Sequence, residues 1–285
     1  MYDPLYGAVI GDIAGSAYEF HNVKRKDIPL FPFEARFTDD TAMTMAVANA
    51  FVKAGKDDIP AFQSELVREM QRIGRMYPDA GYGGRFIRWI MSEKPAPYGS
   101  YGNGSAMRVS PCALVAETLK EAEALAKASA EVTHNHREGI RGAKAVAAAI
   151  WLAKTHASKK EIRSYIQKHY YPLHFTLDKI RPDYQFDVSC QGSVPQAIVA
   201  FLESEDFEDA IRNAISIGGD SDTIAAMTGS IAWMYYGWEM SDRMTELCEE
   251  AAKRLPDEFR LIIHDFRDKT LYPETGMPIP ACLTD

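Results

Sequence analysis

Apolar residues recur along almost the whole chain at three- and four-residue spacings, and this periodicity constrains the fold more than any other feature. Such spacing lines one face of an α-helix with apolar side chains. Alternating runs of β-branched residues, which favour strands, are nearly absent. We therefore predict an all-α protein with helices at residues 7–16, 42–54, 59–76, 112–133, 137–156, 159–168, 194–204, 206–216, 222–236 and 241–254.

The chain is predicted to form one compact domain over residues 1–285. No linker rich in Pro, Ser or Gly divides it, and 285 residues with 46% hydrophobic side chains suffice for one large core. The net charge of −8 argues against nonspecific binding to nucleic acid or anionic membranes, because both attract proteins with excess Lys and Arg. We expect a monomer rather than an oligomer.

The N-terminus and the cysteines indicate a cytoplasmic protein. Asp12 interrupts the first apolar residues and no basic segment precedes them, so the N-terminus does not resemble a signal peptide. The longest uncharged run, residues 223–238, is shorter than the roughly 20 residues that a membrane-spanning helix needs. The scattered cysteines indicate neither a zinc site nor a disulfide framework; they are Cys112, Cys190, Cys248 and Cys282.

Two acidic clusters, residues 38–41 and 220–223, stand where helices are predicted to begin. Asp and Thr are favoured at helix N-termini, so capping alone would explain one such cluster. Capping needs only one or two oxygens, however, and the clusters together supply four carboxylates and four hydroxyls. If the clusters meet, bare carboxylates repel each other by about 1 to 4 kcal/mol per close pair, and a divalent cation removes this repulsion. We therefore interpret the clusters as two halves of one metal site.

The ligand chemistry of these clusters favours a hard cation. Carboxylate and hydroxyl oxygens without Cys or His select Mg²⁺, Mn²⁺ or Ca²⁺ over zinc. The contiguous twelve-residue loop of an EF-hand is absent, so we favour Mg²⁺ or Mn²⁺ over Ca²⁺. The number of carboxylates allows two ions.

A glycine-rich segment at residues 97–108 is a candidate anion-binding loop. Its glycines could turn successive backbone N–H groups toward a phosphate, aided by the helix that follows. A flexible turn with a salt bridge from Arg108 is the alternative, and the segment lacks the Gly-Lys-Ser/Thr ending of a Walker loop.

Two further residues acquire a role only through this context. Glu19 follows the N-terminal helix and is either a solvated charge or a fifth carboxylate at the metal site. His134 lies between two predicted helices, where it could contact a ribose or a phosphate, or could instead cap a helix or be partly buried.

Taken together, these motifs resemble the ADP-ribosylglycohydrolase family over almost the whole chain. The residues that carry the resemblance, in chain order, are 11–19, 37–41, 99–111, 133–134, 192–197 and 218–223. The resemblance implies an orthogonal helical bundle and an enzyme that uses two divalent cations to cleave ADP-ribose from a protein side chain or a small molecule. The glycine-rich loop is similar to that of the branch that includes serine-linked ADP-ribose hydrolases.

The resemblance also implies a role for individual residues. The implied metal ligands are Thr38, Asp39, Asp40, Asp220, Asp222 and Thr223. The implied substrate-binding residues are Gly99, Ser100, Tyr101, Gly102, Asn103 and His134. The catalytic candidates are Glu19, Asp39, Asp40 and Asp222, any of which could accept the proton of an attacking water.

Two other functions are compatible with the same residues. A two-metal phosphoesterase acting on a nucleotide would use the same carboxylates and phosphate loop. A non-catalytic ADP-ribose-binding protein could share the fold, although it has no need for so many mutually repelling carboxylates.

Overall fold

The computed structural model describes residues 3–238 and 240–272, and within these ranges it contains helices and no β-strand. The all-α prediction is therefore confirmed, while Cys282 lies outside the described residues. The only extended pairing in this part of the chain is an isolated bridge between Gly102 and Ser189. The helices are α1 (Tyr6–Ser16), α2 (Asp39–Ala54), α3 (Ile59–Met76), α4 (Gly84–Ile90), α5 (Gly104–Met107), α6 (Ser110–Val115), α7 (Leu119–Glu131), α8 (Arg137–Lys154), α9 (Lys159–His169), α10 (Leu177–Ile180), α11 (Cys190–Leu202), α12 (Phe207–Ser216), α13 (Ser221–Tyr236), α14 (Asp242–Ala252) and α15 (Asp257–Phe266), followed by the π-helix η1 (Arg267–Leu271).

One predicted helix, residues 112–133, is wrong as a continuous element. The structure divides it into α6 and α7, with Ala116 in an extended conformation between them. Thr118 caps α7 by accepting a hydrogen bond from the backbone N–H of Glu121, and the Glu121 carboxylate accepts one from the N–H of Glu117. Caps of this kind favour a helix start at Leu119 over continuation of α6.

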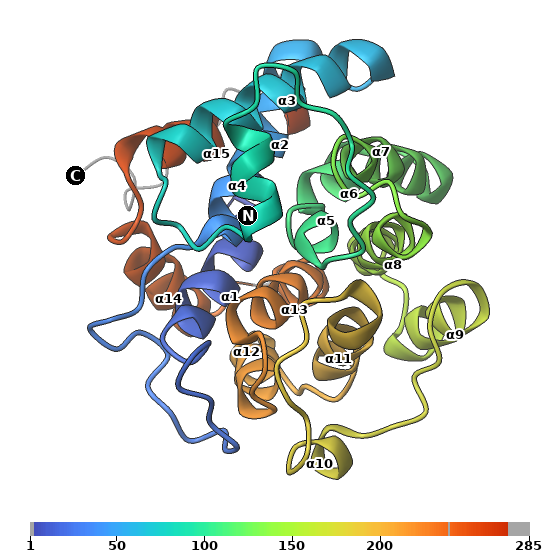
Figure 1. Cartoon of the computed structure of the whole chain (residues 1–285). Coiled ribbons are helices and arrows are strands. Elements are labelled where there is room, and N and C mark those ends of the chain that lie inside the picture. Colours follow the sequence, from blue (N-terminus) through green and yellow to red (C-terminus); the bar gives the residue numbers. More distant parts are fainter. Residues whose placement is uncertain (1–2, 239, 273–285) are drawn as a thin grey trace.

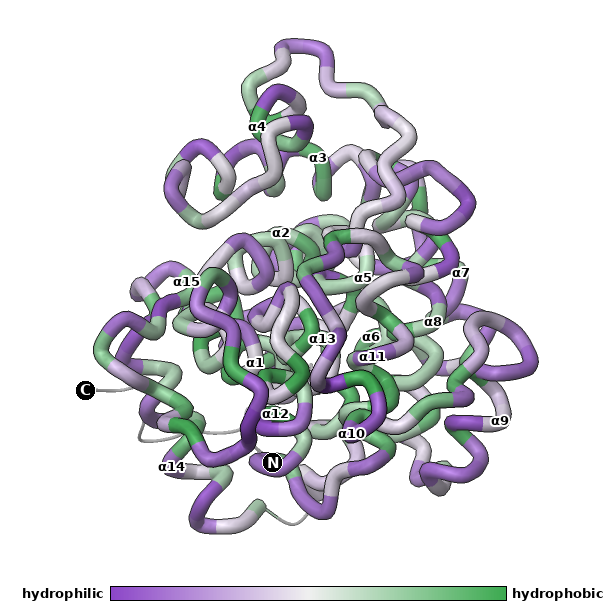
Figure 2. Tube along the Cα trace, turned by 60° about the horizontal axis from the view of Figure 1, so that its bottom comes forward, coloured by the Kyte–Doolittle hydropathy of each residue, from purple (hydrophilic) through white to green (hydrophobic). Residues whose placement is uncertain are grey.

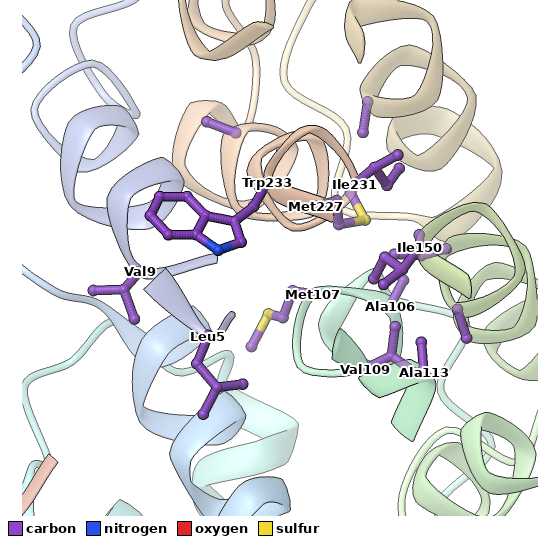
Figure 3. Packing of buried hydrophobic residues seen from close by; sticks show 14 of the residues in the cluster. Leu5, Val9, Ala106, Met107, Val109, Ala113, Ile150, Met227, Ile231 and Trp233 are labelled. Atoms are coloured by element: carbon purple, nitrogen blue, oxygen red, sulfur yellow. The ribbon is translucent and has the colours of Figure 1, made fainter. Parts of the chain in front are cut away.

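The helix α13 forms the centre of the fold. Every residue from Ser221 to Met234 is buried, and the helix packs against α1, α8, α11 and α12. Figure 3 shows Trp233 of α13 on the side of Leu5 and Val9, with Met227 and Ile231 on the side of Ile150. A helix that is buried all round belongs to the core of a large domain.

The helices α1 and α13 are far apart in the sequence and lie side by side in Figure 1. Glycines permit this close approach: a Cβ added to Gly11 would lie 2.0 Å from the backbone oxygen of Ala225, and one added to Gly15 would lie 2.5 Å from the Cα of Asp222. The contact therefore places Asp12 of α1 beside the start of α13.

The outer helices are more polar than this centre. The helix α9, at the edge of the molecule in Figure 2, carries many hydrophilic residues and buries only Ile162 and Ile166. Within the described residues, no helix combines the length and the apolar character needed to cross a bilayer.

Candidate active site

The two acidic clusters meet, as the sequence predicts. The first lies at the start of α2 and the second at the start of α13, and the contact between α1 and α13 brings a further carboxylate between them. Single oxygens of Asp12, Asp40 and Asp222 lie within 4.8 Å of one another, and so do single oxygens of Glu19, Asp220 and Asp222. Asp222 belongs to both groups, so the carboxylates form one continuous cluster.

Asp12 belongs to the carboxylate cluster although no sequence motif singles it out as a ligand. Its side chain is fully buried, and its Oδ2 accepts hydrogen bonds from the backbone N–H groups of Thr38 (2.9 Å) and Thr41 (3.0 Å). Its Oδ1 accepts a third bond from the Thr38 hydroxyl at 2.6 Å. Asp12 thus fixes the first turn of α2. The signal was a lone acid in an otherwise small and apolar helix, residues 7–16, because an unpaired carboxylate is rarely buried without a reason.

The buried side chain of Asp40 has one oxygen that could coordinate a cation. Its Oδ2 accepts a hydrogen bond from the Thr223 hydroxyl at 3.2 Å and lies 3.2 Å from the Thr38 hydroxyl. Its Oδ1 is buried and has no hydrogen-bond partner among the described residues. A buried acceptor without a partner is costly, and a bound cation would satisfy it. The residues present therefore fit a hard divalent cation.

Capping does not account for the second cluster. Thr38 does cap α2, by accepting from the N–H of Asp40 at 3.4 Å. Asp220 stands at the N-cap of α13 but makes no capping hydrogen bond with its side chain. Its Oδ2 instead accepts from the side-chain amide of Asn103 at 2.6 Å, which joins the glycine-rich loop to the acidic cluster.

Burial and mutual repulsion raise the carboxyl pKa values throughout the cluster. Burial is the larger cause for Asp39, Asp40 and Asp222, whose pKa values lie well above the usual range, and neighbouring carboxylates raise them further. Burial, together with the charge of Asp222, raises the pKa of Glu19 to about 8. Burial also raises the pKa of Asp220 to about 6, although the hydrogen bond from Asn103 opposes this shift. The fold therefore assembles negative charge that only protons or cations can neutralise.

A cleft of about 450 Å³ opens above the cluster. Its walls include Glu19, Asp39, Asp220, Asp222 and Thr223 on the acidic side, and Ser100, Gly102, Asn103 and His134 on the side of the glycine-rich loop. Thr38 and Asp40 do not line the cleft and are buried. Gly99 and Tyr101 do not line it either, and the exposed Tyr101 ring contacts His136.

The glycine-rich loop is not the series of free backbone donors that the sequence suggests. The N–H of Gly99 donates to the Asn135 side chain, that of Gly102 to the Ser100 hydroxyl, and that of Asn103 to the Val188 carbonyl. These bonds hold the loop in place and occupy three of its donors. The salt bridge suggested for Arg108 is also absent from the described residues, because its guanidinium is buried and donates to the carbonyls of Gly104 and Ser129.

Two exposed aromatic residues stand at the edge of the cleft. Phe20, next to Glu19, has 77% of its surface exposed, and its ring lies 6.3 Å from that of Phe186 in a stacked arrangement. They join the segment after α1 to the segment before α11, beside the acidic part of the cleft.

Comparison with known proteins agrees with this geometry. A sequence model of the family described as ADP-ribosylglycohydrolase matches residues 2–272. The chain is 27% identical to the ADP-ribosylhydrolase ARH3 of Mus musculus, with 86% of each chain covered. It is also 27% identical to the ADP-ribosylarginine hydrolase Tri1 of Pseudomonas putida (strain GB-1), with 92% of this chain and 81% of the relative covered.

A solved structure described as an ADP-ribosylglycohydrolase-related protein complex has the same fold. It matches with a TM-score of 0.68 at 22% sequence identity, and the match covers 94% of this chain and 96% of the other. The match of the family sequence model over almost the whole length therefore identifies the chain as a member of the ADP-ribosylglycohydrolase family.

Proposed function

We propose that this protein is a divalent-cation-dependent hydrolase that cleaves the glycosidic bond between ADP-ribose and an acceptor. Membership of the family makes the chain a glycohydrolase that acts on ADP-ribose conjugates. Two observations carry the metal dependence: Asp12, Asp40 and Asp222 converge from three helices, and the buried Oδ1 of Asp40 has no hydrogen-bond partner among the described residues.

The proposed cation ligands are the carboxylates of the two groups, together with Thr38 and Thr223, whose hydroxyls lie beside Asp40, and Asp39, which lines the same cleft. Their oxygen-only chemistry favours Mg²⁺ or Mn²⁺, and two groups of three carboxylates provide for two ions. Such ions supply positive charge that orients sugar oxygens and makes a water molecule more acidic.

The residues that line the cleft would transfer the proton and bind the substrate. Glu19 lines the cleft, and one of its carboxylate oxygens lies within 4.8 Å of oxygens of Asp220 and Asp222, so it is a candidate to take up and return the proton of a water molecule. Asp39 and Asp222 also line the cleft and remain candidates for this role, while the buried Asp40 is placed to hold a cation. Ser100, Gly102, Asn103 and His134 would hold the diphosphate and ribose, with the buried charge of Arg108 behind them.

The decisive experiment is a panel of ADP-ribosylated acceptors, linked through arginine, serine, a nucleic acid end or a small metabolite, incubated with and without a chelator. We expect free ADP-ribose and an intact acceptor, with turnover lost on chelation and restored by Mg²⁺ or Mn²⁺. Asp222→Asn is expected to abolish turnover, because Asp222 belongs to both carboxylate groups. The matched control is Asp57→Asn, an exposed aspartate ahead of α3, which should retain full turnover.

Each alternative predicts a different product. Release of phosphate from a nucleotide would identify a phosphoesterase, and binding of ADP-ribose without turnover of any conjugate would identify a binding protein. Full activity in the chelated enzyme or in Asp222→Asn would contradict the proposed metal dependence.

A further inference from the structure

A chain of three side chains runs behind the glycine-rich side of the cleft. The buried guanidinium of Arg108 donates from Nη2 to the Thr133 hydroxyl oxygen at 3.0 Å, and that oxygen lies 2.7 Å from Nδ1 of His134. Arg108 is held by two further bonds, from Nη1 to the Gly104 carbonyl at 2.9 Å and from Nη2 to the Ser129 carbonyl at 2.8 Å. Thr133 and His134 are also buried, so water does not compete for these contacts.

The direction of each hydrogen bond follows from the available protons. A guanidinium can only donate, so the Thr133 oxygen must accept from Arg108. The Thr133 hydroxyl has one hydrogen, and His134 Nδ1 is its only available acceptor among residues 3–238 and 240–272. If Nδ1 instead carried a proton and donated, the Thr133 hydrogen would be buried without an acceptor, which is unfavourable.

We propose that Arg108 and Thr133 are positioning residues that fix His134 as the neutral tautomer with its proton on Nε2. In this arrangement Thr133 donates to Nδ1, and the Nε2–H group is the donor that remains for a ligand. The pKa of His134 supports a neutral ring, because burial and the nearby charges of Arg108 and Arg85 lower it well below the usual histidine range.

The position of Nε2 shows where this donor acts. It lies 3.2 Å from the place where a Cβ on Gly104 would stand and 3.6 Å from the corresponding place on Gly102. Both glycines line the cleft, and Nε2 has no hydrogen-bond partner among the described residues. The absence of side chains at these two positions therefore leaves room for a ligand atom to reach Nε2.

An Nε2–H donor that cannot change to an acceptor suits a ligand oxygen that can only accept hydrogen bonds. A phosphate oxygen has this property, whereas a hydroxyl could pair with either tautomer. Three backbone donors of the loop are already occupied, so the Nε2–H group of His134 would supply a donor that these N–H groups do not. This inference rests on the proposed function for the identity of the ligand, which would be the diphosphate of ADP-ribose. The tautomer itself depends only on the protein.

The tautomer can be read directly from ¹⁵N chemical shifts in protein labelled at its histidines. The chain has seven histidines, and the signals lost in His134→Gln assign those of His134. We expect Nδ1 to show the shift of an unprotonated nitrogen and Nε2 that of a protonated one, in ligand-free protein with Mg²⁺. A proton on Nδ1 in the wild type would overturn the proposal. This measurement needs no substrate, so it decides the tautomer even if the protein does not act on ADP-ribose.

Variants of Thr133 test the consequence for binding. Thr133→Val keeps the shape of the side chain but removes the hydroxyl, and we expect its Nδ1 shift to change and ADP-ribose to bind about tenfold more weakly, as for the loss of one hydrogen bond to a charged group. The effect should appear in KM more than in kcat, because His134 holds the diphosphate away from the bond that breaks. Thr133→Ser restores the hydroxyl and should restore both the shift and the affinity. Unchanged Nδ1 shift and affinity in a folded Thr133→Val protein would overturn the proposal. If that variant does not fold, the shifts of the wild type decide.

Discussion

Asp12 organises the acidic site more directly than the carboxylates that the sequence singles out. It accepts three hydrogen bonds from Thr38 and Thr41 while one of its oxygens lies among those of Asp40 and Asp222. The same side chain therefore fixes the start of α2 and contributes charge to the site. Because Asp12 both fixes the start of α2 and contributes a carboxylate to the site, we expect that replacing an acceptor oxygen of its side chain with a donor disrupts both.

We predict that Asp12→Asn abolishes turnover and lowers the affinity for Mn²⁺ by at least about tenfold, the range known for altered metal environments. The asparagine amide has the same shape as the carboxylate. Its NH₂ group, however, would face the N–H and hydroxyl donors of Thr38 and Thr41, which bond to the carboxylate in the wild type. Binding of Mn²⁺ can be followed by titration calorimetry. Asp3→Asn is the matched control, because Asp3 is a buried aspartate that pairs with Arg267 outside the site. Wild-type affinity in Asp12→Asn would remove Asp12 from the metal site.

At the residue scale, the sequence predicts clusters better than single residues. Asp39, Asp40, Asp220 and Asp222 could be found because each cluster repeats the same types of side chain before an apolar helix. Asp12 has no such neighbours, and its role depends on a contact between α1 and α13 that no local pattern reveals.

At the element scale, glycines decide how close the two central helices come. Gly7 of α1 and Gly229 of α13 face each other, so that a Cβ on Gly229 would lie 2.1 Å from the Gly7 oxygen. The helices themselves could be predicted, and residues 59–76 match α3 at both ends. Which helices pack against each other could not be predicted. Small residues indicate that a helix can pack closely, but they do not indicate which neighbouring helix it contacts.

We predict that Gly11→Ala destabilises the protein by roughly 3 kcal/mol, the upper part of the range for overpacking, because the new Cβ would overlap the backbone of α13. Denaturant unfolding followed by circular dichroism measures the change. Gly84→Ala is the control: it adds the same methyl group at the first residue of α4, where nothing lies within 4 Å, and should cost no stability. Equal stability of the two variants would contradict the close packing of α1 on α13.

At the scale of the whole molecule, the buried carboxylates link stability to pH. Their pKa values are raised in the folded protein, so the stability they contribute is present below their unfolded values near 4 and is lost as the pH rises through the folded values. The values of about 6 for Asp220 and about 8 for Glu19 place much of this loss between pH 4 and 8. Cations bind the deprotonated form, so they should restore stability most strongly at the upper end of this window.

We predict that Mg²⁺ or Mn²⁺ raises the Tm more at pH 8 than at pH 5.5. At about 100 times the dissociation constant, the stabilisation at pH 8 should be about 2.7 kcal/mol, or roughly 4 to 5 °C in a chain of this size. Thermal unfolding with added metal or with a chelator at the two pH values measures this difference. Asp222→Asn should lose most of the metal effect. A metal-induced increase that is equal at both pH values would contradict a site built from carboxylates with raised pKa values.

The pairing of α1 with α13 has a consequence for biosynthesis. Asp12, Glu19 and Asp40 emerge early from the ribosome, whereas Asp220 and Asp222 follow only near the end of translation. A nascent chain therefore carries three of these five acids without the helix that completes their surroundings, and the pairing of distant segments is a slow step in folding. A shortened product that ends before α13 lacks the buried helix on which α1, α8, α11 and α12 pack, so it should neither fold to the native core nor assemble the acidic site.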